Sequence, residues 1–325
     1  TGYWWSPDER YIALQRTDES TVDVIPRLDI TGGTIDANGF AFTYSGVIGN
    51  GNGTTGGLTI ANTGGNAGGS VTLANTETYT GRTTINRAAT LNLGVGNAIA
   101  ASSGVVVNGT LNLGGSDQRI AALSGTGTVT NVTNSNVLTV AGGTASTFSG
   151  AITDGSGKTA LSLVNANTAL TLSGANTYSG GTTVGDGVSA SSLIGGAANA
   201  FSANSSVTVR SASNLDLGGF NQQIAGLSGS GTVTNNGTIT SSAYGISVDA
   251  DKAIVTNNKV IKAAGGVTID GASNVLTNTG TITATKTGIA AIDFSGTAAS
   301  QFKNSGLVES TGTAFLGGDG VQKVI

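Results

Sequence analysis

The stretch Leu170-Thr-Leu-Ser-Gly-Ala-Asn-Thr-Tyr-Ser-Gly-Gly-Thr-Thr-Val184 decides the fold, because the chain repeats it. Val71-Thr-Leu-Ala-Asn-Thr-Glu-Thr-Tyr-Thr-Gly-Arg-Thr-Thr-Ile85 has the same pattern 99 residues earlier, and residues 138–150 form a weaker copy. Each copy predicts a short strand with alternating apolar and threonine positions, a polar turn, an aromatic residue and a second strand. A unit of this size cannot bury its own apolar face, so the copies must stack to form a core.

A second repeat supports the same architecture. Residues 111–131 match residues 215–235 at 15 of 21 positions, with an offset of 104 rather than 99 residues. The five additional residues (104 − 99) must lie in turns, because a stacked strand cannot absorb an insertion without losing its register. We therefore predict an all-β solenoid.

The composition restricts the chemistry of this solenoid. Glycine accounts for 53 of the 325 residues, as expected for short strands joined by tight turns, and the chain has no histidine, cysteine or methionine. The missing residue types exclude Ser-His-Asp catalysis, thiol nucleophiles, disulfides and thiolate metal sites. The net charge of −4 argues against binding to nucleic acid. The chain contains no run of 18 apolar residues, which is the length that would predict a membrane-spanning helix.

Residues 1–30 differ in composition from the rest of the chain. Both tryptophans and both prolines lie here, but only one of the 53 glycines. The motif Trp4-Trp-Ser-Pro-Asp8, followed by Tyr11-Ile-Ala-Leu14, resembles a propeller blade of the dipeptidyl-peptidase IV family. A single blade strand lacks the hydrolase domain of that family, so we interpret this segment as a fusion or assembly scar. The alternative is an unusual N-terminal cap for the solenoid.

From residue 31 onward the chain resembles the passenger domains of Gram-negative autotransporters. Leu170 to Val184 is similar to the autotransporter-associated β-strand repeat, and Phe42-Thr-Tyr-Ser-Gly-Val-Ile48 resembles the segment that often precedes it. This similarity covers roughly residues 31–235 and is most specific in the copy from Leu170 to Val184. The resemblance implies a right-handed parallel β-helix at the cell surface, with a C-terminal membrane β-barrel in the full-length chain. We expect that barrel to be absent from this sequence, which lacks a series of amphipathic strands of roughly ten residues.

Residues 236–325 have a shorter period, which is marked by asparagine. Four segments similar to Asn-x-Gly-x-Ile recur at steps of 22, 21 and 26 residues. They begin at Asn235, Asn257, Asn278 and Asn304. A step of 21 or 22 residues is about one coil of a β-helix, so residues 31–325 would make roughly 13 coils with a spacing of about 4.8 Å. We predict that these four side chains form a structural ladder in which each amide bonds to the next. The same period predicts two files of interior side chains stacked from coil to coil, one of Val248, Ile269 and Ile292 and a neighbouring one of Ile239, Ile261 and Ile282.

Three aspartates are candidates for a metal site. Asp249 and Asp270 each precede a ladder asparagine by eight residues, and Asp293 closes a third copy with three extra residues before its asparagine. We predict that the three carboxylates occupy the same position on successive coils. Their repulsion would favour a bound Ca²⁺ ion, the only cofactor that we consider. Two alternatives stay open: each aspartate ends a strand and bonds the following turn, or the carboxylates cleave glycosides.

The sequence thus predicts a non-catalytic, extracellular β-helical stalk at the surface of a Gram-negative bacterium. Its partners would be glycans or proteins on host or bacterial surfaces. The alternative function is that of a β-helical polysaccharide lyase or glycoside hydrolase, which would need a cleft with converging acids and a base. Outside the three aspartates, acidic residues are single and scattered along the chain, which favours the non-catalytic interpretation.

Overall fold

The fold is known from a computed structural model of the chain. The structure describes residues 3–5, 11–14, 27–51, 54–64, 68–241, 246–248, 251–286, 291–294, 300–310, 315–317 and 323–324. These residues form strands and turns, and no helix that could cross a membrane occurs among them. The chain divides into two compact units, residues 1–142 with 146–159 and residues 143–145 with 160–325.

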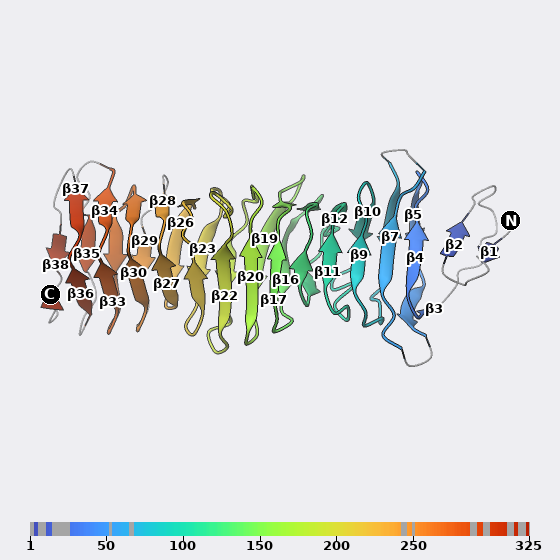
Figure 1. Cartoon of the computed structure of the whole chain (residues 1–325), viewed down its shortest axis with the longest axis horizontal. Coiled ribbons are helices and arrows are strands. Elements are labelled where there is room, and N and C mark those ends of the chain that lie inside the picture. The colour runs from blue at the N-terminus through green and yellow to red at the C-terminus, as the bar shows by residue number, and fades with distance from the viewer. Residues whose placement is uncertain are drawn as a thin grey trace. The chain divides into compact units, whose positions relative to one another are not determined.

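Unit 1 is built from short strands that pair in parallel with the strand one coil away (Figure 1). One sheet joins β1, β2, β4, β7, β9, β11 and β14, with β1 antiparallel to β2. A second joins β5, β8, β10, β12, β15 and β18, and the smaller pairs are β3 with β6 and β13 with β16. Its strands are β1 (Tyr3–Trp5), β2 (Tyr11–Leu14), β3 (Arg27–Ile30), β4 (Gly33–Asp36), β5 (Ala41–Tyr44), β6 (Val47–Asn50), β7 (Leu58–Ala61), β8 (Ser70–Leu73), β9 (Thr83–Ile85), β10 (Thr90–Leu93), β11 (Val105–Val107), β12 (Thr110–Asn112), β13 (Gln118–Ile120), β14 (Leu123–Ser124), β15 (Thr128–Thr130), β16 (Ser135–Val140) and β18 (Ala151–Ile152).

Unit 2 has the same construction with three faces. Its sheets run β21-β23-β26-β29-β32-β35-β38, β20-β22-β24-β27-β30-β33-β36-β39 and β25-β28-β31-β34-β37. The strands are β20 (Thr168–Leu172), β21 (Thr182–Val184), β22 (Ser191–Gly195), β23 (Ser206–Val209), β24 (Asn214–Asp216), β25 (Gln222–Gln223), β26 (Gly226–Gly229), β27 (Thr232–Asn235), β28 (Thr238–Ser241), β29 (Ile246–Val248), β30 (Ile254–Asn257), β31 (Val260–Ala263), β32 (Val267–Ile269), β33 (Val275–Asn278), β34 (Thr281–Ala284), β35 (Ile292–Phe294), β36 (Gln301–Asn304), β37 (Leu307–Ser310), β38 (Phe315–Gly317) and β39 (Lys323–Val324). Two further strands, β17 (Ala145–Phe148) and β19 (Lys158–Leu163), have residues in both units.

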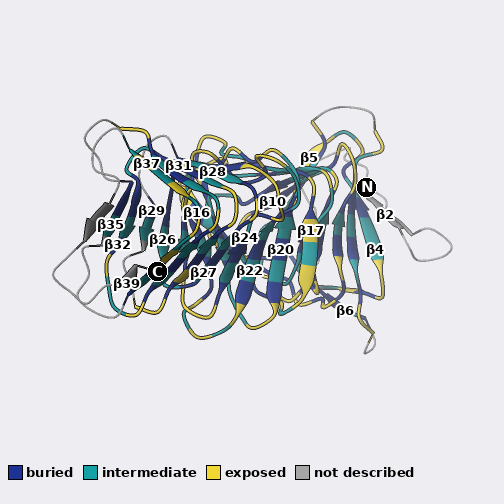
Figure 2. Ribbon diagram, turned by 60° about the vertical axis from the view of Figure 1, so that its left-hand side comes forward, coloured by how far each residue is buried: buried dark blue, intermediate teal, exposed yellow. Residues whose placement is uncertain are grey.

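The parallel β-solenoid that the sequence predicts is therefore confirmed. Along strands such as β8, β20 and β27, buried side chains alternate with partly exposed ones, and Figure 2 shows buried and less buried segments along the described strands. Ile239, Ile261 and Ile282 pair in register on β28, β31 and β34 and are buried, so the predicted file of isoleucines exists. A second predicted file is correct only in part, because Val248 pairs with Ile269 but Ile292 pairs with Val267.

The repeated segments adopt one local structure in both units. Tyr79 follows β8 and Tyr178 follows β20, and both rings are buried. The hydroxyl of each tyrosine lies 2.7 Å from the hydroxyl of the threonine four residues later, Thr83 or Thr182. Each threonine in turn hydrogen-bonds a serine of the next coil, at 2.9 Å in both cases. The Tyr-x-Gly-x-Thr pattern thus buries an aromatic ring and satisfies its hydroxyl.

A glycine pair in the second repeat marks a close approach between coils. Gly114 and Gly218 both have positive φ, at 69° and 62°. A Cβ atom at Gly114 would lie 1.8 Å from the backbone oxygen of Leu93, and one at Gly218 would lie 2.0 Å from that of Gly195. Both the backbone angle and the contact therefore require glycine, which explains why Leu-Gly-Gly recurs in the two copies.

The division between the two compact units lies near residues 142–160, whereas the sequence pattern changes near residues 30 and 235. The repeat changes at residues 235 and 236, but β27 pairs with β24 on one side and with β30 on the other, without a break in the sheet. At the N-terminal end, β3 falls inside the predicted segment 1–30 and pairs in parallel with β6. Strand β2 pairs in parallel with β4, and with β1 in antiparallel fashion.

Replacing Tyr178 with phenylalanine should lower the free energy of unfolding by about 1 kcal/mol, because Thr182 loses a buried hydrogen-bond partner. Replacing it with alanine should cost about 3–5 kcal/mol through the cavity that remains. Urea denaturation measures both values. The matched control is Tyr44→Phe, since the buried Tyr44 hydroxyl has no hydrogen-bond partner among the described residues. Equal losses for the two phenylalanine variants would contradict the assigned role of the Tyr178 hydroxyl.

Candidate functional site

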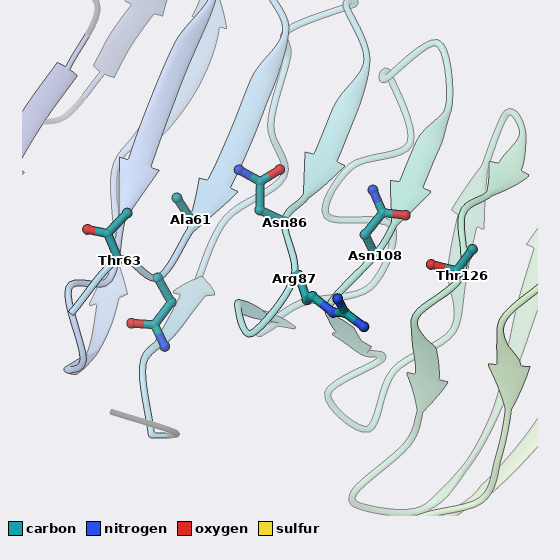
Figure 3. Close-up of a pocket in the computed structure, with 7 residues that line it drawn as sticks. Ala61, Thr63, Asn86, Arg87, Asn108 and Thr126 are labelled. Carbon is teal, nitrogen blue, oxygen red and sulfur yellow. The ribbon is translucent and has the colours of Figure 1, made fainter. Parts of the chain in front are cut away.

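A shallow recess on the outer surface of unit 1 is the candidate binding site (Figure 3). It has a volume of about 600 Å³. Its lining is polar and includes three amides, two hydroxyls and one guanidinium group. The lining residues are Ala61, Asn62, Thr63, Asn86, Arg87, Asn108 and Thr126.

The recess follows from the register of the sheet that contains β7, β9, β11 and β14. Asn86 and Asn108 come directly after Ile85 and Val107, which pair with each other. Ser124 pairs with Val106. Thr126 follows Ser124 by two residues and Asn108 follows Val106 by two residues, so Thr126 corresponds to Asn108. Asn86, Asn108 and Thr126 therefore occupy equivalent positions on successive coils, with a spacing of about 4.8 Å. All three side chains are exposed.

One end of the recess is held in place by hydrogen bonds. Asn62 accepts the Gly39 backbone N–H at 2.7 Å and donates to the Ala88 backbone oxygen at 3.1 Å. Thr63 donates to Asp36 through both its backbone N–H and its hydroxyl. Partial burial opposes ionisation of Asp36, but the bonds from Thr63 and Asn38 outweigh it and hold the pKa of this carboxyl below its ordinary value. Asp36 is therefore a fixed negative charge at this end.

Arg87 supplies the positive charge of the recess. Its side chain is exposed, and Figure 3 shows the guanidinium group extending toward the side of the recess where Asn108 lies. A guanidinium group carries five N–H donors in a planar fork that matches a carboxylate. The recess thus combines a row of neutral polar groups with one cation.

A second unusual group of unit 1, Glu77, lies in the interior. Its side chain is 1% exposed, and its Oε2 atom accepts the Ile48 backbone N–H at 2.5 Å. The other oxygen, Oε1, is buried without a hydrogen-bond partner among the described residues, as is the hydroxyl of Tyr44. Burial raises the pKa of Glu77 to about 7, which the single bond from Ile48 opposes. In the other copy of the repeat the equivalent residue is Asn176, which carries no charge.

The charge of Glu77 acts on two tyrosines, Tyr44 and Tyr79. Burial first, and the Glu77 charge second, raises the pKa of Tyr44. Burial also raises the pKa of Tyr79, to which the Glu77 charge adds, although the bond to Thr83 opposes the rise. Neither tyrosine ionises near neutral pH, so Glu77 is the group of this cluster that titrates there.

Stability should depend on pH through Glu77. The folded state holds the proton more tightly than the unfolded chain, whose glutamates have a pKa of 4.5. The full stability is therefore present below pH 4.5 and is lost as pH rises through about 7, with a total loss of roughly 3 kcal/mol. Glu77→Gln should remove this dependence and be more stable than the wild type at pH 8.

Thermal unfolding between pH 4 and pH 8.5 checks this expectation. The matched control is Glu309→Gln, which changes an exposed glutamate and should retain the pH profile of the wild type. Identical pH profiles for the wild type and Glu77→Gln would show that the buried carboxyl does not control stability in this range.

The asparagine ladder of unit 2 lies in the interior and is structural. Asn235, Asn257 and Asn278 are 0% exposed, and each occupies the last position of its strand. Each Nδ2 atom donates to the Oδ1 atom of the next asparagine, at 2.7, 2.6 and 2.7 Å, and the row ends at Asn304. Each also donates to a backbone oxygen of the next coil, that of Val260, Thr281 or Leu307. These are the amide-to-amide bonds that the 21- to 22-residue step predicts.

Asn257→Ala should lower the free energy of unfolding by about 2–3 kcal/mol, because Asn278 Oδ1 loses its buried donor and Asn235 loses an acceptor. Asn258→Ala is the control at the adjacent position. Asn258 is exposed and donates to Asn236 Oδ1 at 2.7 Å, so its removal should cost less than about 0.5 kcal/mol. Chemical denaturation of both variants decides the comparison, and similar costs would argue against the ladder as a source of stability.

The predicted row of aspartates is not formed as expected. Asp293 pairs with Thr268, and Phe294 pairs with Ile269, so Asp293 does not occupy the position of Asp270. Seven residues, 285–291, separate β34 from β35, whereas three residues, 264–266, separate β31 from β32. The longer coil therefore has most of its extra residues before Asp293 rather than after it. The predicted alignment of these two carboxylates is wrong.

The metal site itself stays a prediction. Asp249 lies outside the described residues, and Asp270 is exposed. Within the described part of the chain, no three His, Cys, Asp or Glu side chains lie close enough together to hold a metal ion. The recess was not predicted from the sequence, although one signal for it was present. A 22-residue step separates Asn86 from Asn108, as it separates Asn235 from Asn257, and this shared step was the available signal.

Comparison with known proteins adds one match. The family model described as the N-terminal region of dipeptidyl peptidase IV matches residues 1–46. No curated protein and no solved structure matches the chain. The matched residues include the segment whose Trp-Trp-Ser-Pro-Asp motif resembles that family, and they extend into β4 and β5 of unit 1. They cover less than half of the chain and none of the lining of the recess.

Proposed function

We propose that this chain is a non-catalytic, extracellular stalk from the passenger domain of a Gram-negative autotransporter, and that it serves surface display and adhesion. The observation that carries the proposal is the agreement between the repeat and the coil. In both copies of the autotransporter-like segment, the two strands and the buried tyrosine between them occupy equivalent places in a parallel solenoid. The resemblance in sequence thus extends to the structural unit.

The pairing pattern suits a protein that folds after crossing a membrane. From β3 onward, the described strands pair with strands one coil away, so coils can form one after another as the chain emerges. The chain has no cysteine, so no disulfide could lock it before transport. Both features support the proposal.

The outer face of one sheet of unit 1 is polar, as expected for a surface that contacts water. Strands β8, β10, β12 and β15 direct small polar side chains outward, in two rows that are in register from coil to coil. One row contains Asn92 and Asn112, whose side chains hydrogen-bond each other at 2.9 Å. Such rows satisfy polar groups along this face of the sheet through bonds between neighbouring coils.

The recess supports binding rather than catalysis. A polysaccharide lyase or hydrolase is the second candidate function, and glycoside cleavage generally uses a pair of carboxylates. None of the seven residues that line the recess is acidic. The nearby Asp36 is held by Thr63 and keeps its charge, so it is poorly suited to donate a proton.

Display is the direct test of the proposal. The whole chain, placed between a secretion signal and an autotransporter β-barrel, should reach the surface of a Gram-negative host. Antibody labelling of intact cells should detect it, and the displaying cells should adhere to one another or to coated surfaces more than cells with the barrel alone. Retention in the periplasm would contradict the passenger assignment, and display without added adhesion would contradict the adhesive role.

A further inference from the structure

The asparagines of the recess differ from those of the ladder although their sequence spacing is the same. Asn235 and Asn257 point inward, are fully buried and satisfy each other. Asn86 and Asn108 are exposed, and their side chains make no hydrogen bond to a described residue. Structural stability therefore explains the inner pair and leaves the outer pair without a role.

We propose that the recess of unit 1 binds an acidic polysaccharide, which lies along the successive coils that carry Asn86, Asn108 and Thr126. This inference deepens the proposed adhesive function and rests on it. A side-chain amide offers two donors and an oxygen acceptor, so it can bond the neighbouring hydroxyls of a sugar. Because equivalent positions recur at about 4.8 Å, the row presents the same polar groups repeatedly to a chain molecule with repeating hydroxyls.

The charge pattern selects an acidic sugar and its orientation. Arg87 presents a guanidinium fork, which binds a carboxylate or sulfate through two parallel hydrogen bonds. Asp36 holds a negative charge beside Thr63, at the other end of the recess. The acidic group of the ligand is therefore placed near Arg87 and Asn108, and its neutral hydroxyls extend toward Asn86 and Asn62.

Other polymers fit the recess less well. A peptide that adds to a sheet needs an unpaired strand edge, but β9 and β11 pair on both sides. A nucleic acid needs several cations along its backbone, whereas Arg87 is the only cationic side chain among the described residues that line the recess. A polymer with many hydroxyls and a few acidic groups matches both the row of neutral polar side chains and the single charge of Arg87.

Binding of the purified full chain to polygalacturonate, alginate and hyaluronan tests the proposal. Wild type should bind at least one of the three, and full methyl esterification of the bound carboxylates should weaken the complex about tenfold. Arg87→Gln should cause a similar loss, and the double variant Asn86→Ala with Asn108→Ala should lose binding about tenfold or more. The control is Arg119→Gln, which removes an exposed charge of unit 1 outside the recess and should leave binding unchanged.

Three results would overturn the site. These are no binding to any of the three polysaccharides, equal losses for Arg87→Gln and Arg119→Gln, and equally tight binding of polyglutamate, which carries carboxylates without sugar hydroxyls. The variants change exposed side chains, so circular dichroism and surface display should match those of the wild type. A failed binding experiment with intact display would remove the site and leave the passenger assignment in place. A failure of display would remove the assignment instead.

Discussion

The backbone hydrogen bonds between each strand and its partners one coil away are the interaction on which the rest of the structure depends. Most strands have only three or four residues, which is too short for a strand to be stable alone. Their stabilising effects add up because the strands are in register, which places inward-facing side chains of one coil on inward-facing side chains of the next, as with Ile239, Ile261 and Ile282. The glycines at Gly114 and Gly218 serve the same requirement, since a side chain there would push the coils apart.

Stacking in register also decides how polar groups are tolerated in a narrow interior. Asparagines that repeat in the interior satisfy one another, and each tyrosine of the repeat bonds a threonine hydroxyl that in turn bonds a serine of the next coil. Glu77 departs from this pattern, with one oxygen bonded and the other not. A carboxyl in such a place favours its protonated form. The asparagine at the equivalent position of the other copy donates instead to the Ala200 and Gly174 backbone oxygens, so it satisfies the same kind of site without a charge.

The same periodicity gives the outer surface its character. Equivalent outward positions recur about every 4.8 Å, so polar residues at several of these positions form a row rather than isolated groups. Where the row consists of bonded asparagines and threonines it is part of the scaffold, as at Asn92 and Asn112. Where the groups stay unpaired, as in the recess at Asn86 and Asn108, they are available to a ligand with its own repeat.

Sequence by itself determined the architecture, since the internal repeats and the asparagine step require stacked coils, and it placed the ladder from Asn235 to Asn304 and the file of Ile239, Ile261 and Ile282 correctly. It could not place Asp293, because spacing reports only how many residues a coil contains and not which turn holds the extra ones. It also could not separate Asn86 and Asn108 from Asn257 and Asn278, or reveal that Glu77 is buried. Side chains alternate between the two faces of a strand, so a shift of one residue relative to the strand decides between interior and surface, and only the tertiary pairing fixes that shift.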